Sequence, residues 1–167
     1  MSYEKGKNQN ILLEVFVVFA AVLVMMLLLY FVMRISFQEG ESSINTSTYI
    51  ADRIAHRIYT EPTEDEVRMI GSVLRYVAHL GLFFVVGLVT TFVSMVIFRR
   101  YYRIFGVLLS GGLCYILAYY TEYYKQFIEG RHFQQSDVVL NWYGSAAGVA
   151  CMVISYFMNK LLVKLSS

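Results

Sequence analysis

Long runs of apolar residues alternate with short polar segments along this chain. The runs cover residues 11–33, 76–98, 104–120 and 138–163. A helix rises about 1.5 Å per residue, so about 20 apolar residues cross the roughly 30 Å hydrocarbon core of a membrane. The run over 104–120 is the shortest, and its tyrosines would extend it into the membrane interface. The pattern predicts an all-α, polytopic membrane protein, folded as an antiparallel bundle of four transmembrane helices.

The first apolar run follows Lys5 and Lys7, as the core of a secretory signal peptide follows its basic residues. This run is too long for such a core, and no small-residue cleavage site precedes Arg34. We therefore expect an uncleaved membrane anchor. Together with the other three runs it predicts one membrane domain over residues 1–167.

The polar segment over residues 34–71 carries a helical repeat of its own. Apolar residues recur there at every fourth position, at Ile50, Ile54 and Ile58. This spacing is typical of an amphipathic helix, which either lies flat on the membrane surface or packs on the end of the bundle. The sequence leaves both placements open.

Residues 63–66 carry the signature of a helix N-terminus. Thr63 and Glu66 have the spacing of a capping box, in which each side chain accepts a hydrogen bond from the other residue's backbone amide. We therefore expect the second transmembrane helix to begin before its apolar run and to enter the membrane without a break.

Basic residues in short loops favour the cytoplasmic side of a membrane. In the predicted bundle one end receives most of them, namely Lys5, Lys7, Arg99, Arg100, Arg103, Lys160 and Lys164. The other end receives many of the acidic residues, including Glu61, Glu64, Asp65, Glu66, Glu122, Glu129 and Asp137. This asymmetry favours cytoplasmic N- and C-termini and an extracellular 34–71 segment.

Composition agrees with a membrane location. The 167 residues are 57% hydrophobic with a mean hydropathy of +0.54, which exceeds what the core of a soluble domain of this size needs. The surplus apolar surface must contact membrane lipids. The net charge of +2 gives no reason to expect nucleic acid as a partner. Cys114 and Cys151 lie in the middle of apolar runs, which favours small core side chains over a disulfide.

Polar side chains gather near the ends of three predicted helices. Charged groups at membrane depth cost about 3 kcal/mol, so such groups are paired, hydrated or functional. The topology brings them to the same end of the bundle as the 34–71 segment, where Arg75 and Glu122 could offset each other's unfavourable helix-end positions. The full set is Arg75, His79, Glu122, Lys125, Arg131, Asp137 and Asn141. We expect a polar network that either clamps the helix ends or binds a phosphate or polar headgroup.

Small residues follow the polar group on the last predicted helix. Gly144 and Gly148 lie four apart, with only serine and alanine between them. Small residues at this spacing let helix backbones approach closely in membranes. We expect a packing face there, with Gly106, Gly111 and Gly112 of the third predicted helix as its contact points.

The polar and glycine positions together resemble the VanZ-like family of small bacterial membrane proteins. The matching residues are Arg75, His79, Glu122, Phe127, Gly130, Arg131, Asp137, Asn141, Gly144 and Gly148. Lys125 departs from the family pattern, which usually has glutamine at this position. The resemblance implies a single VanZ-like domain in the bacterial cell membrane. It also implies a role like that of the family's namesake, which raises resistance to the glycopeptide antibiotic teicoplanin.

Three functional hypotheses suit these features. In the first, the chain binds a lipid headgroup, a cell-wall precursor or a lipoglycopeptide at the outer leaflet. In the second, it is a membrane enzyme that uses His79 as a general base, oriented by Glu122 or Asp137. In the third, it is a partner subunit without a ligand. The sequence has no zinc-ligand spacing or phosphate loop, so it predicts no metal and no cofactor, and it leaves the catalytic residues and the oligomeric state open.

Overall fold

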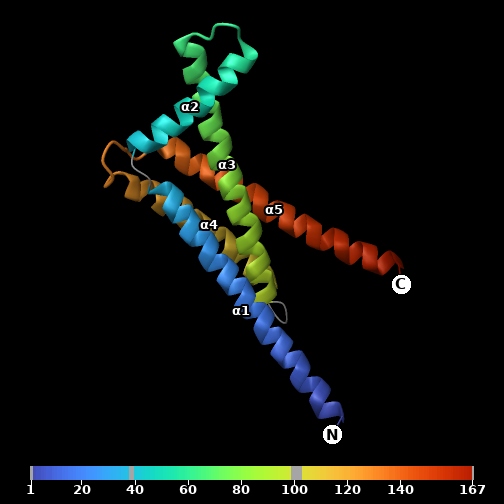
Figure 1. The fold of residues 1–167 in the computed structure, drawn as a ribbon. Coiled ribbons are helices and arrows are strands. Elements are labelled where there is room, and N and C mark those ends of the chain that lie inside the picture. Colours follow the sequence, from blue (N-terminus) through green and yellow to red (C-terminus); the bar gives the residue numbers. More distant parts are fainter. Residues whose placement is uncertain (1, 38–39, 99–102, 167) are drawn as a thin grey trace.

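The computed structural model describes the backbone of residues 2–37, 40–98 and 103–166, and the side chains of residues 15–37, 47–98 and 103–166. Within these ranges the chain forms five α-helices and no strand (Figure 1). They are α1 (Ser2–Ser36), α2 (Gly40–Ile58), α3 (Glu64–Ile97), α4 (Arg103–Lys125) and α5 (Gln135–Ser166). The all-α fold predicted from the sequence is confirmed.

Four of the described helices have the length and apolar composition to cross a membrane: α1 from Val15 onward, α3, α4 and α5. They carry large apolar side chains on the outside, and Phe16, Leu108 and Phe157 expose 66%, 69% and 62% of their surface. Removing apolar surface from water is worth about 25 cal/mol per Å², so such a surface is stable in contact with lipid. This is the surface of a multi-pass membrane protein.

The membrane helices alternate in direction (Figure 1). The helices α1 and α4 run toward the end of the bundle that carries α2, and α3 and α5 run away from it. We call this end, formed by α2, the start of α3 and residues 126–134, the α2 end. The start of α1 and the end of α5 lie on the opposite side. Of the basic residues expected there, Arg99 and Arg100 lie outside the described residues, as do the side chains of Lys5 and Lys7.

A capping box begins α3, as predicted. The Thr63 hydroxyl accepts a hydrogen bond from the Glu66 amide at 3.4 Å, and a Glu66 carboxylate oxygen accepts one from the Thr63 amide at 2.8 Å. The helix then continues without interruption to Ile97. Arg75 and His79 therefore lie on one continuous helix, which holds their backbones at fixed positions.

The helix α2 packs on the start of α3, which agrees with one of the two placements that the sequence left open. Its Ala51 and Ala55 are fully buried, and Gly71 of α3 leaves room for the Ala51 methyl group. Ile58, by contrast, exposes 64% of its surface. The alanines form the contact because small residues let two helices approach closely. The isoleucine repeat lies to the side of this contact, where Ile50 borders a cavity.

Glycines join the backbones of α5 and α3. A Cβ atom on Gly144 would lie 2.5 Å from the Leu80 carbonyl oxygen, and one on Gly148 would overlap the carbonyl oxygen of Phe84. On α3, Gly87 has the same role, because a Cβ atom there would overlap the backbone of α5. Gly144 and Gly148 therefore form the close contact of α5.

The partner of this contact differs from the expected one. A Cβ atom on Gly111 or Gly112 of α4 would meet nothing within 4 Å, so neither glycine makes room for the close approach of another helix. Gly106 faces Ser94 of α3 rather than α5. The expectation of an α4 partner is therefore wrong. The reason is that α3 supplies Gly87, which lies in a long apolar run and is marked by no motif.

A small apolar core joins α1, α3 and α4. It contains Val32, Phe83, Val86, Cys114 and Ala118. Cys114 is buried as predicted, and its sulfur lies 3.1 Å from the Thr90 hydroxyl. The same prediction for Cys151 is wrong, because the second half of α5 diverges from the bundle and leaves this cysteine exposed (Figure 1).

Candidate functional site

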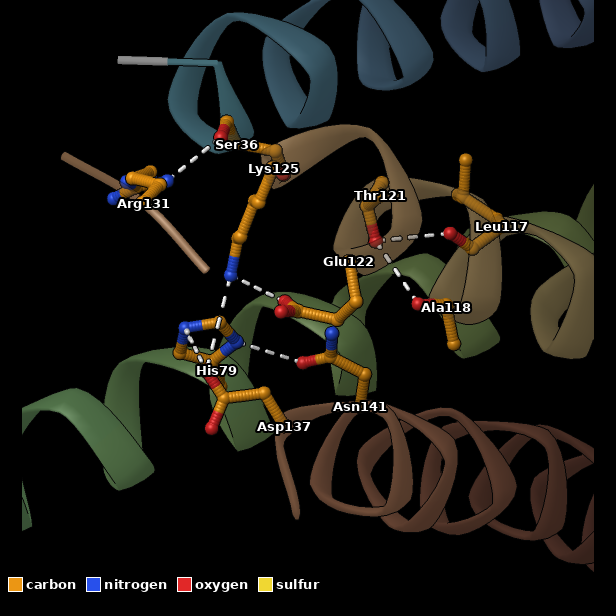
Figure 2. A network of polar contacts seen from close by, with 10 residues as sticks. All are labelled: Ser36, His79, Leu117, Ala118, Thr121, Glu122, Lys125, Arg131, Asp137 and Asn141. Atoms are coloured by element: carbon orange, nitrogen blue, oxygen red, sulfur yellow. Dashed lines mark hydrogen bonds and ion pairs between the residues drawn. The ribbon is translucent and has the colours of Figure 1, made fainter. Parts of the chain in front are cut away.

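Polar side chains of three helices converge at the α2 end (Figure 2). The helix α3 contributes His79, α4 contributes Glu122 and Lys125, and α5 contributes Asp137 and Asn141. Residues three or four positions apart share a helix face, which brings the two α4 residues together and the two α5 residues together. The close contact of α3 with α5 then brings His79 against the α5 pair. We call these five residues the polar network.

Two acids and a lysine form the charged centre of the polar network. The Lys125 ammonium donates a hydrogen bond to Glu122 Oε1 and lies 3.8 Å from Asp137 Oδ2. All three residues are buried: Glu122 exposes 1%, Asp137 5% and Lys125 7% of its surface. Removal of one partner from a buried ion pair costs about 3–5 kcal/mol, because it leaves the other charge uncompensated. Lys125 is the nearest counter-charge of both acids, so its removal would leave both of them without their closest partner.

His79 connects α3 to this centre. Its Nδ1 lies 2.8 Å from Asn141 Oδ1, and its Nε2 lies 3.9 Å from Asp137 Oδ2. An amide oxygen only accepts hydrogen bonds, so Nδ1 is the nitrogen that carries the proton in this pair. The lone pair of neutral His79 is then on Nε2, the nitrogen nearer to Asp137. Asn141 thus sets both the tautomer and the ring orientation of His79.

Two buried polar atoms of the network have no hydrogen-bond partner among the described residues. They are Glu122 Oε2 and Asn141 Nδ2, and both residues are almost completely buried. The great majority of buried polar groups in proteins are hydrogen-bonded. Two unsatisfied atoms in one cluster therefore indicate that the network binds something further, such as a water molecule, an ion or a polar ligand.

Arg131, in the segment between α4 and α5, holds that segment to α1. Its Nη1 donates a hydrogen bond of 2.7 Å to the carbonyl oxygen of Ser36, the last residue of α1. Burial lowers the pKa of the Arg131 guanidinium, the negative charge of Glu122 raises it, and the positive charge of Arg75 lowers it. The side chain stays charged at neutral pH. It therefore brings a half-buried positive charge to the edge of the polar network.

A cavity of about 310 Å³ lies beside the polar network. Its polar lining consists of Ser36, Ser47, Arg75, His79, Lys125 and Arg131. Its apolar lining consists of Ile35, Ile50, Leu74, Ala78, Leu82 and Phe83. Arg75 is exposed and makes no hydrogen bond or ion pair within the part of the chain that the structure describes. The cavity thus combines positive charge with an apolar wall.

The seven polar residues singled out in the sequence all lie at the α2 end, but the expected pairing of Arg75 with Glu122 is not the one observed. Glu122 pairs with Lys125 rather than with Arg75, because Lys125 lies one turn further along the same helix. The hydrogen bond of Arg131 goes to the backbone of α1. The role of Ser36 could not be predicted from the sequence, because it contributes a main-chain carbonyl that becomes free at a helix end, and no side-chain type marks such a group.

The site has groups for three kinds of chemistry. Its guanidinium groups suit a phosphate or carboxylate, which they bind through paired N–H donors. The His79 Nε2 atom suits proton abstraction or metal coordination. The buried acids suit a cation.

A comparison of the chain with models of protein families, with characterised proteins and with solved structures finds no match.

Proposed function

We propose that this chain binds an amphiphile with an anionic head in the cavity at the α2 end. The head, a phosphate or a carboxylate, contacts Arg75 and Arg131, and the apolar part lies against the isoleucine and leucine side chains of the wall. A membrane lipid headgroup, a lipid-linked cell-wall precursor and a lipoglycopeptide share this chemistry. In this proposal the α2 end faces the outer leaflet.

Arg75 and Arg131 line one cavity, and this shared position is the main support for an anion site. Their positive charges repel each other, which contributes to the lowered pKa of Arg131. An anion between them would replace this repulsion with charge-assisted hydrogen bonds, which are roughly twice as strong as neutral ones. Arg75 has no hydrogen bond or ion pair within the described residues, so its guanidinium can turn to a ligand without losing one.

The apolar wall supports an amphiphile over a free ion. Ile35, Leu82 and Phe83 border the same cavity as the arginines. A volume of about 310 Å³ lies at the lower limit for ligand pockets, which measure about 300–1,000 Å³. It suits a headgroup with the first part of a hydrocarbon chain. The remainder of the chain would stay in the surrounding membrane.

Two features of the sequence support an outward-facing site. Basic residues at the opposite end of the bundle favour the cytoplasm for that end. The resemblance to the VanZ-like family implies the bacterial cell membrane and resistance to teicoplanin, and glycopeptides act on wall precursors outside that membrane. Binding of a precursor or of the antibiotic at the outer leaflet would link the cavity to resistance.

Lipid binding by the purified chain tests the proposal. Arg75→Ala and Arg131→Ala should each lower the retention of phosphatidylglycerol in native mass spectrometry, whereas zwitterionic phosphatidylcholine should be retained weakly by every variant. Arg68→Ala is the matched control, because Arg68 is exposed on α3 and does not line the cavity. Equal retention of phosphatidylglycerol by the Arg75 and Arg68 variants would refute the proposal.

Teicoplanin resistance in cells, measured together with ligand retention by the purified chain, distinguishes the possible anionic ligands. In a teicoplanin-sensitive Gram-positive host the chain should raise resistance, and Arg75→Ala should remove this effect at unchanged membrane abundance. Retention of teicoplanin by the purified chain would identify the antibiotic as the ligand. Retention of a lipid-linked wall precursor without teicoplanin would identify protection of the antibiotic's target.

The orientation of His79 favours a second candidate, a membrane enzyme that acts on the same amphiphile. Asn141 holds the ring so that Nε2 can serve as a general base, and Asp137 lies on the same side. His79→Gln separates the two candidates. If the chain only binds, the variant keeps most of its lipid retention and resistance. If His79 removes a proton from a substrate, the variant keeps lipid retention and loses resistance.

A further inference from the structure

We propose that His79, Glu122 and Asp137 bind a divalent transition-metal ion, in competition with the ammonium group of Lys125. One potential ligand atom from each residue lies within 4.8 Å of the other two. The three residues come from three helices, α3, α4 and α5. The metal ligands include neither arginine of the anion cavity, although His79 borders both sites.

The ligand set suits a first-row transition ion. Imidazole nitrogen together with carboxylate oxygen binds Zn²⁺, Mn²⁺ or Fe²⁺, whereas Mg²⁺ and Ca²⁺ prefer oxygen ligands alone. Bonds of about 2.0–2.2 Å to a metal hold ligand atoms within roughly 4 Å of one another, so the three side chains would close by about 1 Å around the ion. Such a movement needs only small changes of side-chain torsion angles.

The surroundings of His79 match those of a metal ligand. Histidines that bind metals usually donate their other ring N–H to a carbonyl or carboxylate oxygen. The Nδ1 atom of His79 makes such a contact with Asn141 Oδ1 at 2.8 Å. The lone pair on Nε2 therefore remains for the metal, and the nearest carboxylate, that of Asp137, lies 3.9 Å from it.

An unsatisfied oxygen gives independent support. Glu122 Oε2 is buried and has no hydrogen-bond partner in the described part of the chain, while Oε1 accepts from Lys125. Figure 2 shows the carboxylate directed toward His79 and the Lys125 nitrogen. A buried polar atom without a partner is rare in proteins. A metal ion bound by Glu122 would satisfy this oxygen.

The charge balance favours a divalent ion over the lysine alone. Glu122 and Asp137 carry two negative charges, and the Lys125 ammonium supplies one positive charge between them. Arg131 attracts both acids, but its hydrogen bond goes to Ser36. A divalent ion would neutralise both carboxylates. Lys125 also borders the cavity, so its ammonium can turn into this space when an ion binds.

Metal binding by the purified full chain tests this proposal. After treatment with a chelator, the chain in detergent should bind one Zn²⁺ ion in equilibrium dialysis. His79→Ala, Glu122→Gln and Asp137→Asn should each weaken this binding by about tenfold or more, because each removes a ligand. Lys125→Met should tighten it by about tenfold or more, because a competing positive charge is lost.

His56 provides the matched control. It lies 3.4 Å from Asp52 on the exposed side of α2 and forms a second histidine–carboxylate pair. His56→Ala should leave the affinity of the tight site unchanged. Circular dichroism shows whether each variant keeps its helices. Mn²⁺ adds a measurement on the unmodified chain, because pulsed electron paramagnetic resonance detects a histidine nitrogen bound to Mn²⁺.

Three results would overturn the metal site. They are Zn²⁺ binding that survives His79→Ala, absence of nitrogen coupling to Mn²⁺ in the unmodified chain, and Zn²⁺ binding confined to the Lys125→Met variant. The third result would mean that the ammonium is a permanent counter-charge. The anion site is tested by a different measurement, the retention of phosphatidylglycerol in Arg75 variants. The metal site and the anion site can therefore fail or succeed separately.

Discussion

The Lys125 ammonium donates a hydrogen bond to the Glu122 carboxylate inside the bundle, one turn away on α4. Asp137 of α5 lies 3.8 Å from the same nitrogen. One side chain thus joins two helices through two buried acids. The Lys125 charge is therefore the nearest compensation for both negative charges in the interior of the α2 end.

Lys125→Met should lower the free energy of unfolding by about 3–5 kcal/mol, because Glu122 and Asp137 would remain buried without their nearest counter-charge. Unfolding in detergent, with a chelator present, measures the loss. Adding Glu122→Gln should recover part of it, since one of the two uncompensated charges disappears. Lys160→Met, at an exposed lysine of α5, is the control. Equal stability of the Lys125 and Lys160 variants would contradict the pairing.

In the second candidate function, where Asp137 acts with His79, Asp137→Asn should leave the protein folded and remove the proposed effect on teicoplanin resistance. The amide keeps the shape of the carboxylate, and Lys125 still has Glu122 as a partner, so the cost in stability is smaller than for Lys125→Met. Resistance and membrane abundance are measured side by side. If both fall together at Arg75, His79, Glu122, Arg131 and Asp137, the polar residues only clamp the helix ends.

Gly148→Ala should lower the free energy of unfolding by about 1–3 kcal/mol, because the added methyl group overlaps the Phe84 carbonyl oxygen. Gly112→Ala is the matched control. A Cβ atom there meets nothing within 4 Å, and alanine favours a helix over glycine by about 0.5–1 kcal/mol. Thermal unfolding in detergent compares the two. Two variants of the same stability would argue against the α3–α5 contact.

Gln134→Cys should react with a membrane-impermeant thiol reagent on intact cells, and Arg100→Cys should not, because the positive-inside rule assigns the arginine cluster to the cytoplasm. The background lacks Cys114 and Cys151, since Cys151 is exposed on α5 and carries a free thiol. Lysed cells provide the control, because both sites should then react. Labelling of Arg100→Cys alone on intact cells would invert the topology and turn the cavity toward the cytoplasm.

The helices, and the end of the bundle that holds the polar residues, can be predicted from local sequence patterns. An apolar run of membrane length forms a spanning helix, because its backbone groups must be satisfied within the segment when lipid surrounds it. The capping box of Thr63 and Glu66 marks the start of α3 for an equally local reason. Successive helices cross the membrane in opposite directions. Arg75, Glu122 and Asp137 therefore come to the same end of the bundle, however the helices pack against one another.

Which of these residues touch depends on the packing of the helices and is seen only in the folded structure. Helical spacing gives the face on which a side chain lies, but the rotation and crossing of helices depend on where two backbones can approach. The contact of Gly148 with α3 around Gly87 sets this approach. It brings His79 to the polar residues of α5, and Lys125 rather than an arginine lies between the acids. The cavity and the unsatisfied Glu122 oxygen cannot be predicted from the spacing of residues along the chain. Both depend on how several helices fill the space between them.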